Sequence, residues 1–266
     1  MSRTSVLVTM LAVLCAASAR AQRAWLTNDT SRNFSLEIGK GFFRSSANID
    51  FGSVILTAQA RVPVNARTAI TIAIPISHIS ESGAFSESTS QTAVGNPWIG
   101  VELVSKPDLT FEAGIRPGIA SDANSAASFL GLLDDFDRFE AWLPKVTSLR
   151  ATAHMGSIPA SGTFVTGKLG GMYVLARQGG TSELYADYGV RAGFREPGVL
   201  VSLGLTGRAR LTHGGSLDDR TVHHLTFIVE GMRGNFRPIA SIGTYLDDRA
   251  REDVKAIVTV GATIVY

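Results

Sequence analysis

Charged side chains recur at alternate positions along segments whose other positions are apolar. A β-strand places alternate residues on opposite faces, so each such segment has one apolar face and one face that carries charge. The charges on the polar faces are nine basic and five acidic residues: Arg61, Arg116, Arg150, Lys168, Arg191, Arg208, Arg210, Arg237 and Lys255, and Glu37, Glu102, Glu112, Asp187 and Glu230. Enclosed in one interior, these side chains can pair with one another or line a water path with a mild preference for anions.

Three functions fit such an enclosed and charged interior. The first is a narrow or gated channel for small solutes of unknown identity, which we favour. The second is a structural barrel whose lumen is filled by paired side chains. The third is a barrel enzyme of the hydrolase or acyltransferase kind, with its reacting groups at the outer rim.

A hydrolytic site would need an acid that orients a histidine and a nucleophile within hydrogen-bond reach of that histidine. The candidate is the run Ser77-His78-Ile79-Ser80, which ends a predicted strand at the outer rim. Neither its spacing nor that of the other histidines supplies the missing partners. We therefore expect no enzymatic activity, no catalytic residue, no cofactor and no metal site.

About twelve segments alternate in this way, and they begin near residues 34, 49, 70, 95, 109, 147, 163, 184, 199, 223, 236 and 254. Residues 80–93 are expected to be a polar loop, and residues 95–104 one strand. An even strand number, with tight connections at one end and longer polar ones at the other, is typical of bacterial barrels. The sequence thus predicts an all-β fold, an antiparallel up-and-down transmembrane β-barrel of about twelve strands.

The final strand has the clearest apolar face. It consists of every second residue to the end of the chain: Ala256, Val258, Val260, Ala262, Ile264 and Tyr266. The segment is long enough for an outer membrane, which a tilted strand crosses in about 9–11 residues. We expect the barrel to contact outer-membrane lipid and lipopolysaccharide, and the barrel-assembly machinery to recognise the strand ending at Tyr266.

The first residues predict export. Arg3 precedes a mostly apolar run that ends in Ser18-Ala19-Arg20-Ala21, the pattern of a cleaved secretory signal. The predicted division is therefore a signal peptide over residues 1–21 and a single barrel domain over residues 22–266. Cys15, the only cysteine, would leave with the signal. Removal of Arg3 and Arg20 reduces Lys+Arg from 25 to 23 against 23 acids, so the charge does not favour nucleic-acid binding.

One stretch, residues 125–143, has the three- and four-residue spacing of an amphipathic helix, and Pro144 ends it. Its acidic residues and Arg138 fall mostly on the side opposite the apolar stripe. We expect this helix in an outer loop, where it either rests on the rim or folds inward and narrows the pore. The candidate gate residues are Phe129, Leu133, Phe136, Phe139 and Trp142.

The run Thr92-Ala93-Val94-Gly95-Asn96-Pro97-Trp98-Ile99-Gly100-Val101, the helical loop and the Gly261-Ala262-Thr263-Ile264-Val265-Tyr266 ending carry a family resemblance. Together with the strand pattern, they resemble the transporter-type outer-membrane barrels grouped with the phenol meta-degradation pathway. The resemblance covers the architecture of the mature chain. It implies passage of small, often hydrophobic, solutes across the bacterial outer membrane and transfers no binding residues.

Overall fold

The computed structural model describes residues 31–43, 49–83, 86–175, 180–212 and 217–266. The predicted signal peptide and Cys15 lie outside these ranges. Within them, no helix is both long and apolar enough to cross a bilayer. The strands are β1 (Asn33–Phe43), β2 (Ile49–Pro63), β3 (Thr68–Gly83), β4 (Ser86–Val94), β5 (Trp98–Lys106), β6 (Leu109–Arg116), β7 (Thr147–Met155), β8 (Gly162–Leu175), β9 (Glu183–Glu196), β10 (Val199–Arg210), β11 (Thr221–Gly231), β12 (Phe236–Tyr245) and β13 (Val254–Val265).

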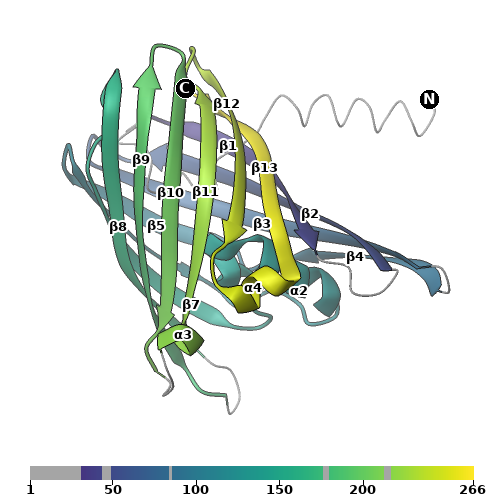
Figure 1. Ribbon diagram of the computed structural model, residues 1–266. Helices are drawn as coiled ribbons and strands as arrows, with labels where there is room; N and C mark the ends of the chain where they lie inside the picture. The colour runs from purple at the N-terminus through teal and green to yellow at the C-terminus, as the bar shows by residue number, and fades with distance from the viewer. Residues whose placement is uncertain (1–30, 44–48, 84–85, 176–179, 213–216) are drawn as a thin grey trace, which may run out of the picture.

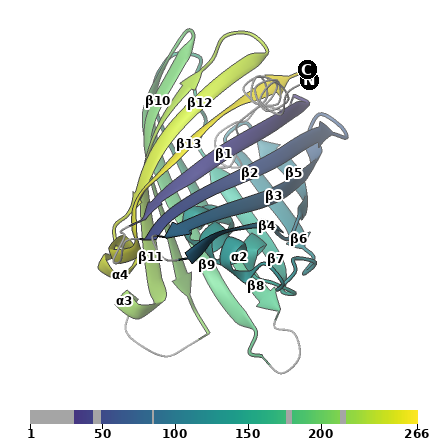
Figure 2. The same cartoon turned by 90° about the vertical axis from the view of Figure 1, so that its right-hand side faces the viewer.

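The strands form a closed antiparallel barrel with twelve positions in the ring (Figures 1 and 2). Each strand pairs with its sequence neighbours, except that β4 and β5 both pair with β3 instead of with each other, and β13 pairs with β1 to close the ring. One position in the ring is shared by β4 and β5, because β3 pairs with β5 from Thr68 to Ala73 and with β4 from Ile76 to Gly83. The predicted fold class and the predicted strand number are confirmed.

The two faces of the wall differ as the alternation predicts. On β3, Ile70, Ile72 and Ile74 point outward and are 39%, 40% and 44% exposed. Between them, Thr71 and Ala73 are buried in the interior. Outward apolar side chains recur on the other strands too, so the barrel carries a continuous apolar belt. Exposure of such a belt to water is unfavourable, and it is typical of a barrel wall that faces lipid.

The helices are α2 (Ser125–Asp134), η2 (Phe136–Trp142), α3 (Leu217–Arg220) and α4 (Asp248–Asp253). Figure 1 shows α3 and α4 at the end of the barrel opposite the C terminus, whereas α2 lies inside the barrel. The single helix expected over residues 125–143 is therefore two short helices. The break falls at Asp135, whose backbone has φ −118° and ψ 68°, and Arg138 is also non-helical.

The structure corrects two other expectations about the strands. The expected polar loop at residues 80–93 is instead mostly strand, because β3 continues to Gly83 and returns as β4. Apolar residues no longer alternate with polar ones in this stretch, so the sequence pattern did not reveal the hairpin. The hairpin leans away from the barrel (Figure 1). The strand expected over residues 95–104 is present but begins at Trp98, because residues 95–97 lie between β4 and β5.

Lys255 does not take the inward position expected for it. Phe42 pairs with Ala256 and Phe43 pairs with Val254, so the register shifts around Lys255, and its side chain is exposed. An extra residue of this kind is a β-bulge, and it reverses the face of the residues beyond it. Val254 is consequently buried inside the barrel end against Tyr245 and Phe136.

Candidate functional site

The segment α2–η2 folds into the lumen, and we call it the plug. Of the two positions left open by the sequence, the structure shows the inward one (Figures 1 and 2). Ala127 and Leu130 of α2 pack against Ile79 and Ala93 of the β3–β4 hairpin. The polar side, predicted to lie opposite the apolar stripe, is also buried, because the polar wall of the barrel surrounds the plug on several sides.

Polar contacts fasten α2 to one arc of the wall, which runs from β12 through β1 to β3. The Asp134 carboxylate accepts a 2.7 Å hydrogen bond from Ser53 Oγ of β2 and a 3.2 Å bond from the Gly41 amide of β1. From β12, Tyr245 Oη donates a 2.6 Å bond to the Leu133 carbonyl. From β3, Ser77 Oγ donates to the carbonyl of α2 at Ala127, also at 2.6 Å. The wall residues Ser53 and Ser77 thus recognise the plug without any charge of their own.

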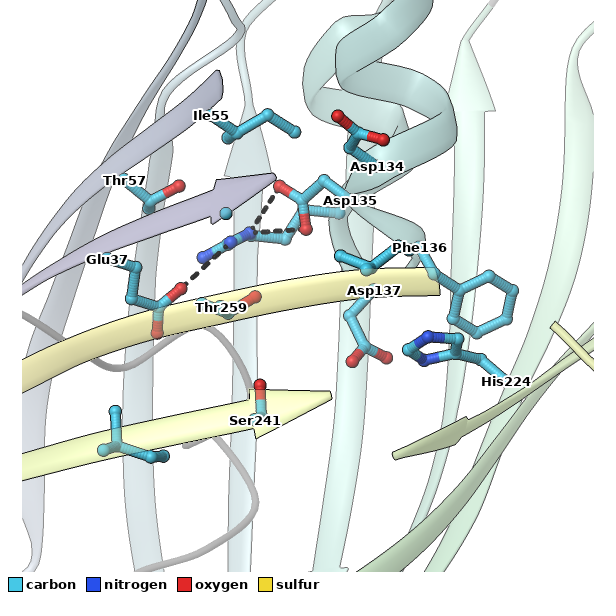
Figure 3. Close-up of a pocket in the computed structure, with 14 residues that line it drawn as sticks. Glu37, Ile55, Thr57, Asp134, Asp135, Phe136, Asp137, His224, Ser241 and Thr259 are labelled. Carbon is cyan, nitrogen blue, oxygen red and sulfur yellow. Dashed lines mark hydrogen bonds and ion pairs between the residues drawn. The ribbon is translucent and has the colours of Figure 1, made fainter. Parts of the chain in front are cut away.

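Ion pairs hold η2 across the middle of the lumen. Arg138 bridges Asp135 of the plug, at 2.8 Å, and Glu37 of β1, at 3.2 Å (Figure 3). On the opposite wall, Lys168 Nζ of β8 lies 2.9 Å from Asp137 Oδ1. All of these groups are largely buried, where an ion pair is costly to break because an uncompensated charge remains.

Two further arginines of the wall contact the backbone and rings of the plug. Arg150 of β7 donates to the Asp137 carbonyl at 2.9 Å. Arg208 of β10 donates to the Phe136 carbonyl at 2.8 Å, and its guanidinium lies 4.8 Å and 4.0 Å from the ring centres of Phe136 and Phe139. Cation–π contacts of this kind are favourable when the cation is desolvated.

Two small cavities flank η2, and Asp137 and Arg138 line both of them. The first, of about 50 Å³, lies against β1, β2, β12 and β13, and four plug or wall carboxylates line it (Figure 3). The second, of about 60 Å³, lies against β2, β3 and β5 to β8, and its lining includes Arg116, Arg150 and Lys168. Each has room for a few water molecules and for nothing much larger. The plug therefore narrows the lumen without filling it.

Burial and charge act on the plug carboxylates in opposite directions. Burial raises the pKa of Asp134 from 3.8 to about 6, although the hydrogen bonds from Ser53 and Gly41 lower it in part. Burial would also raise the pKa of Asp137, but the adjacent Lys168 outweighs it and holds this pKa well below its ordinary value. Asp137 is thus a fixed charge, whereas Asp134 titrates near neutrality.

The predicted lumen-lining residues lie on the inner face of the wall. Arg61, Arg116, Lys168, Asp187, Arg191, Arg208 and Glu230 are buried there, Glu102, Glu112, Arg150 and Arg237 are partly buried, and Arg210 reaches the outer end, where it pairs with Glu183. Many form pairs, among them Arg61 with Glu102 at 2.6 Å and Arg208 with Asp187 at 3.0 Å. Their contact with a solute remains a prediction.

The predicted gate residues divide by burial. Trp142 and Phe136 are buried in the plug, whereas Phe139 and Leu133 are partly buried. Phe129 is 59% exposed. The prediction placed all five on one helix as a possible gate, but the break at Asp135 turns η2 away from α2.

The reasoning from sequence missed Asn96, Gly41, Ser53 and Glu140, which hold the plug in place. Asn96 stands where the wall is interrupted between β4 and β5. Its side chain donates to the carbonyls of Leu143, Val146 and Glu140 and accepts from the Ala120 amide. The sequence does mark Asn96, because Gly95-Asn96-Pro97 interrupts the alternation of polar and apolar residues before β5.

No hydrolytic arrangement surrounds His78 in the described part of the chain. Its Nδ1 lies 2.9 Å from Thr92 Oγ1 on the outer face of the β3–β4 hairpin, and no carboxylate pairs with it there. Among the described residues, no cluster of three histidine, cysteine or acidic groups is suited to a metal ion. The expected lack of enzymatic activity and of a cofactor stays a prediction.

No protein-family model matches the sequence, and no curated protein matches it. Solved structures do match the fold. An outer membrane channel from Pseudomonas putida F1 is 13% identical, with a TM-score of 0.58 over 91% of this chain and 98% of that one. LpxR from Salmonella typhimurium is 10% identical, with a TM-score of 0.56 over 88% and 100%. The translocator domain of the autotransporter NalP from Neisseria meningitidis is 10% identical, with a TM-score of 0.56 over 98% and 96%. At these identities the similarity shows the barrel fold alone.

Proposed function

We propose that this chain is an outer-membrane channel for small solutes and that the plug closes it in the conformation seen here. The observation that carries the proposal is the path of α2–η2 across the lumen, with a cavity on each side of it. A lumen closed by one connected segment can open by a movement of that segment. A lumen closed by side chains of every strand could open only if the barrel itself deformed.

The location in the outer membrane is supported by the apolar belt and by the barrel fold. Lipid leaves no partner for an open strand edge, so a spanning sheet must close on itself. We propose that residues 1–21 are removed on export, that the belt contacts lipid and lipopolysaccharide, and that the assembly machinery reads the strand ending at Tyr266. The exposed terminal side chain, 71% accessible, suits such recognition.

The nature of the contacts also supports a movable plug. Many contacts between plug and wall are hydrogen bonds and ion pairs, and a movement that hydrates both partners leaves no buried charge uncompensated. We propose further that the chain is related to the barrels grouped with phenol meta-degradation, since Asn96 of the family-like run anchors the plug. The polar lining favours polar solutes rather than hydrophobic ones.

The test is a planar-bilayer recording of residues 22–266, refolded in detergent. Wild-type protein should show brief, small openings. A variant in which a short Gly-Ser linker replaces residues 119–145 should conduct steadily and with larger steps. Heat-modifiable gel migration verifies that both proteins are folded barrels. A wild type that stays silent over many insertions supports the structural barrel instead.

A further inference from the structure

We propose that Arg116, Arg150 and Lys168 form a binding site for a small organic anion with two carboxylate groups. In the closed state, Asp137 and Glu140 of the plug occupy this site in place of the solute. The proposal rests on the channel function proposed above and names its solute class. We call the three basic residues the cradle.

The cradle belongs to three adjacent strands of the wall, and each of its members contacts the plug. Lys168 Nζ of β8 lies 2.9 Å from Asp137 Oδ1. Arg116 Nε of β6 donates a 2.9 Å hydrogen bond to Glu140 Oε1. Arg150 of β7 lies between them, 2.9 Å from the Asp137 carbonyl and 3.7 Å from Glu140 Oε1. The two carboxylates of one segment thus meet a cluster of cations on the wall.

Without the plug carboxylates, the three cradle cations outnumber the carboxylates of the wall beside them. The cavity of about 60 Å³ beside the cradle is lined by all three basic residues, by Arg138 of the plug and by the carboxylates of Glu112 and Asp137. When the plug withdraws, it removes Asp137, Glu140 and Arg138 together. The three cations then face Glu112 and, from β9, Asp187, which lies 3.3 Å from Arg150 and also pairs with Arg208. A cleft with more cations than acids favours a bound anion.

The fit between plug and cradle is also incomplete. Glu140 is 1% exposed, yet its Oε2 has no hydrogen-bond partner among the described residues. A buried carboxylate oxygen without a donor is costly, so this internal anion is bound less well than the site allows. A free solute can turn both oxygens of each carboxylate toward the guanidinium groups, whose planar donors match a carboxylate in bidentate pairs.

Competition between solute and plug follows from this geometry. A dicarboxylate that enters the cradle displaces Asp137 and Glu140. It therefore shifts the equilibrium towards the open state by the difference between its affinities for the open and the closed state. The solute would therefore promote its own passage. Removal of a plug carboxylate must strengthen solute binding, whereas a purely structural ion pair predicts no such gain.

The test measures succinate binding by calorimetry on the refolded barrel, with conductance recorded separately. Lys168→Gln should weaken succinate binding about tenfold or more, as loss of a charge-assisted bond implies. Arg61→Gln is the matched control, because it also removes one lumen cation but leaves the cradle intact, and it should change affinity little. Asp137→Asn should bind succinate more tightly than wild type and should open more often.

The outcomes separate the two proposals. Succinate binding that responds to both substitutions, in a protein that never conducts, supports the cradle and overturns the channel. Conductance without succinate binding in wild type or Asp137→Asn supports the channel and overturns the cradle. Equal affinities for Lys168→Gln and Arg61→Gln also overturn the cradle. If Lys168→Gln does not refold, an Asp137→Asn protein that binds no better than wild type overturns it alone.

Discussion

The side-chain amide of Asn96 donates a 2.8 Å hydrogen bond to the backbone carbonyl of Leu143, just beyond η2. This bond joins the interruption in the barrel wall to the end of the plug. The backbone N–H of Asn96 also donates to the Ala141 carbonyl, and the backbone carbonyl of Asn96 accepts from Arg116. One buried residue therefore fixes where the plug re-enters the wall.

Replacement of Asn96 by alanine should loosen the plug without unfolding the barrel. Loss of the side-chain bonds leaves buried carbonyls unsatisfied and should cost about 1 to 3 kcal/mol. Bilayer recordings should then show more frequent openings than in wild type. Asn65→Ala is the control, since Asn65 Oδ1 caps the exposed turn at Arg67 and Thr68, far from the plug. Equal opening in both variants would contradict this role of Asn96.

Gly41 allows α2 to approach β1 closely. A Cβ at this position would lie 1.7 Å from Asp134 Oδ1 and 2.5 Å from its Cγ, so Gly41→Ala should displace Asp134 and increase conductance. The matched control is Gly39→Ala on the same strand, where the nearest atom, Thr259 Oγ1, is 3.6 Å away. This control should conduct like wild type. Alanine tolerated equally at the two positions would show that α2 does not pack against Gly41.

The plug should close more firmly in acid than at neutral pH. The pKa of Asp134 is about 6 when it is docked, against an ordinary value of 3.8, so the docked state binds more protons between these values. The stabilisation is complete below 3.8 and is lost as pH rises to about 6, with an upper limit on the order of 3 kcal/mol. Open probability should therefore rise from pH 4 to pH 6 and change little above it.

Asp134→Asn provides the control for this pH dependence. Asparagine keeps an oxygen for the bonds from Ser53 and Gly41 but cannot ionise. Its open probability should stay level between pH 4 and pH 6, near the low value of wild type in acid. A slope that persists in Asp134→Asn would assign the titration to another group.

The wall of the barrel could be predicted from the sequence because lipid and lumen demand opposite side chains at alternate positions. Ile70, Ile72 and Ile74 face outward for this reason, and the buried charges follow from the same parity. The prediction failed where this demand ends. Lys255 lies in a bulge near the start of β13, and the β3–β4 hairpin extends past the apolar belt.

The plug could be predicted only as a helix, because its position depends on contacts between residues far apart in the chain. Asp134 meets Ser53 over 81 residues, and Arg138 meets Glu37 over 101 residues. Such pairs leave no local period. The apolar stripe left a rim position and an inward position both open, and the polar lumen decides for the inward one because it buries the charged side of the helix.

A reversible disulfide between β1 and α2 tests the gating proposal most directly. Gly41→Cys with Asp134→Cys would place the two Cβ atoms at most about 4 Å apart, within the range of a disulfide. Recordings on the refolded double variant, oxidised and then reduced in the same bilayer, should show silence followed by openings. Openings of equal size and frequency in both states would mean that solutes do not pass where the plug lies, and the gated-channel account would be wrong.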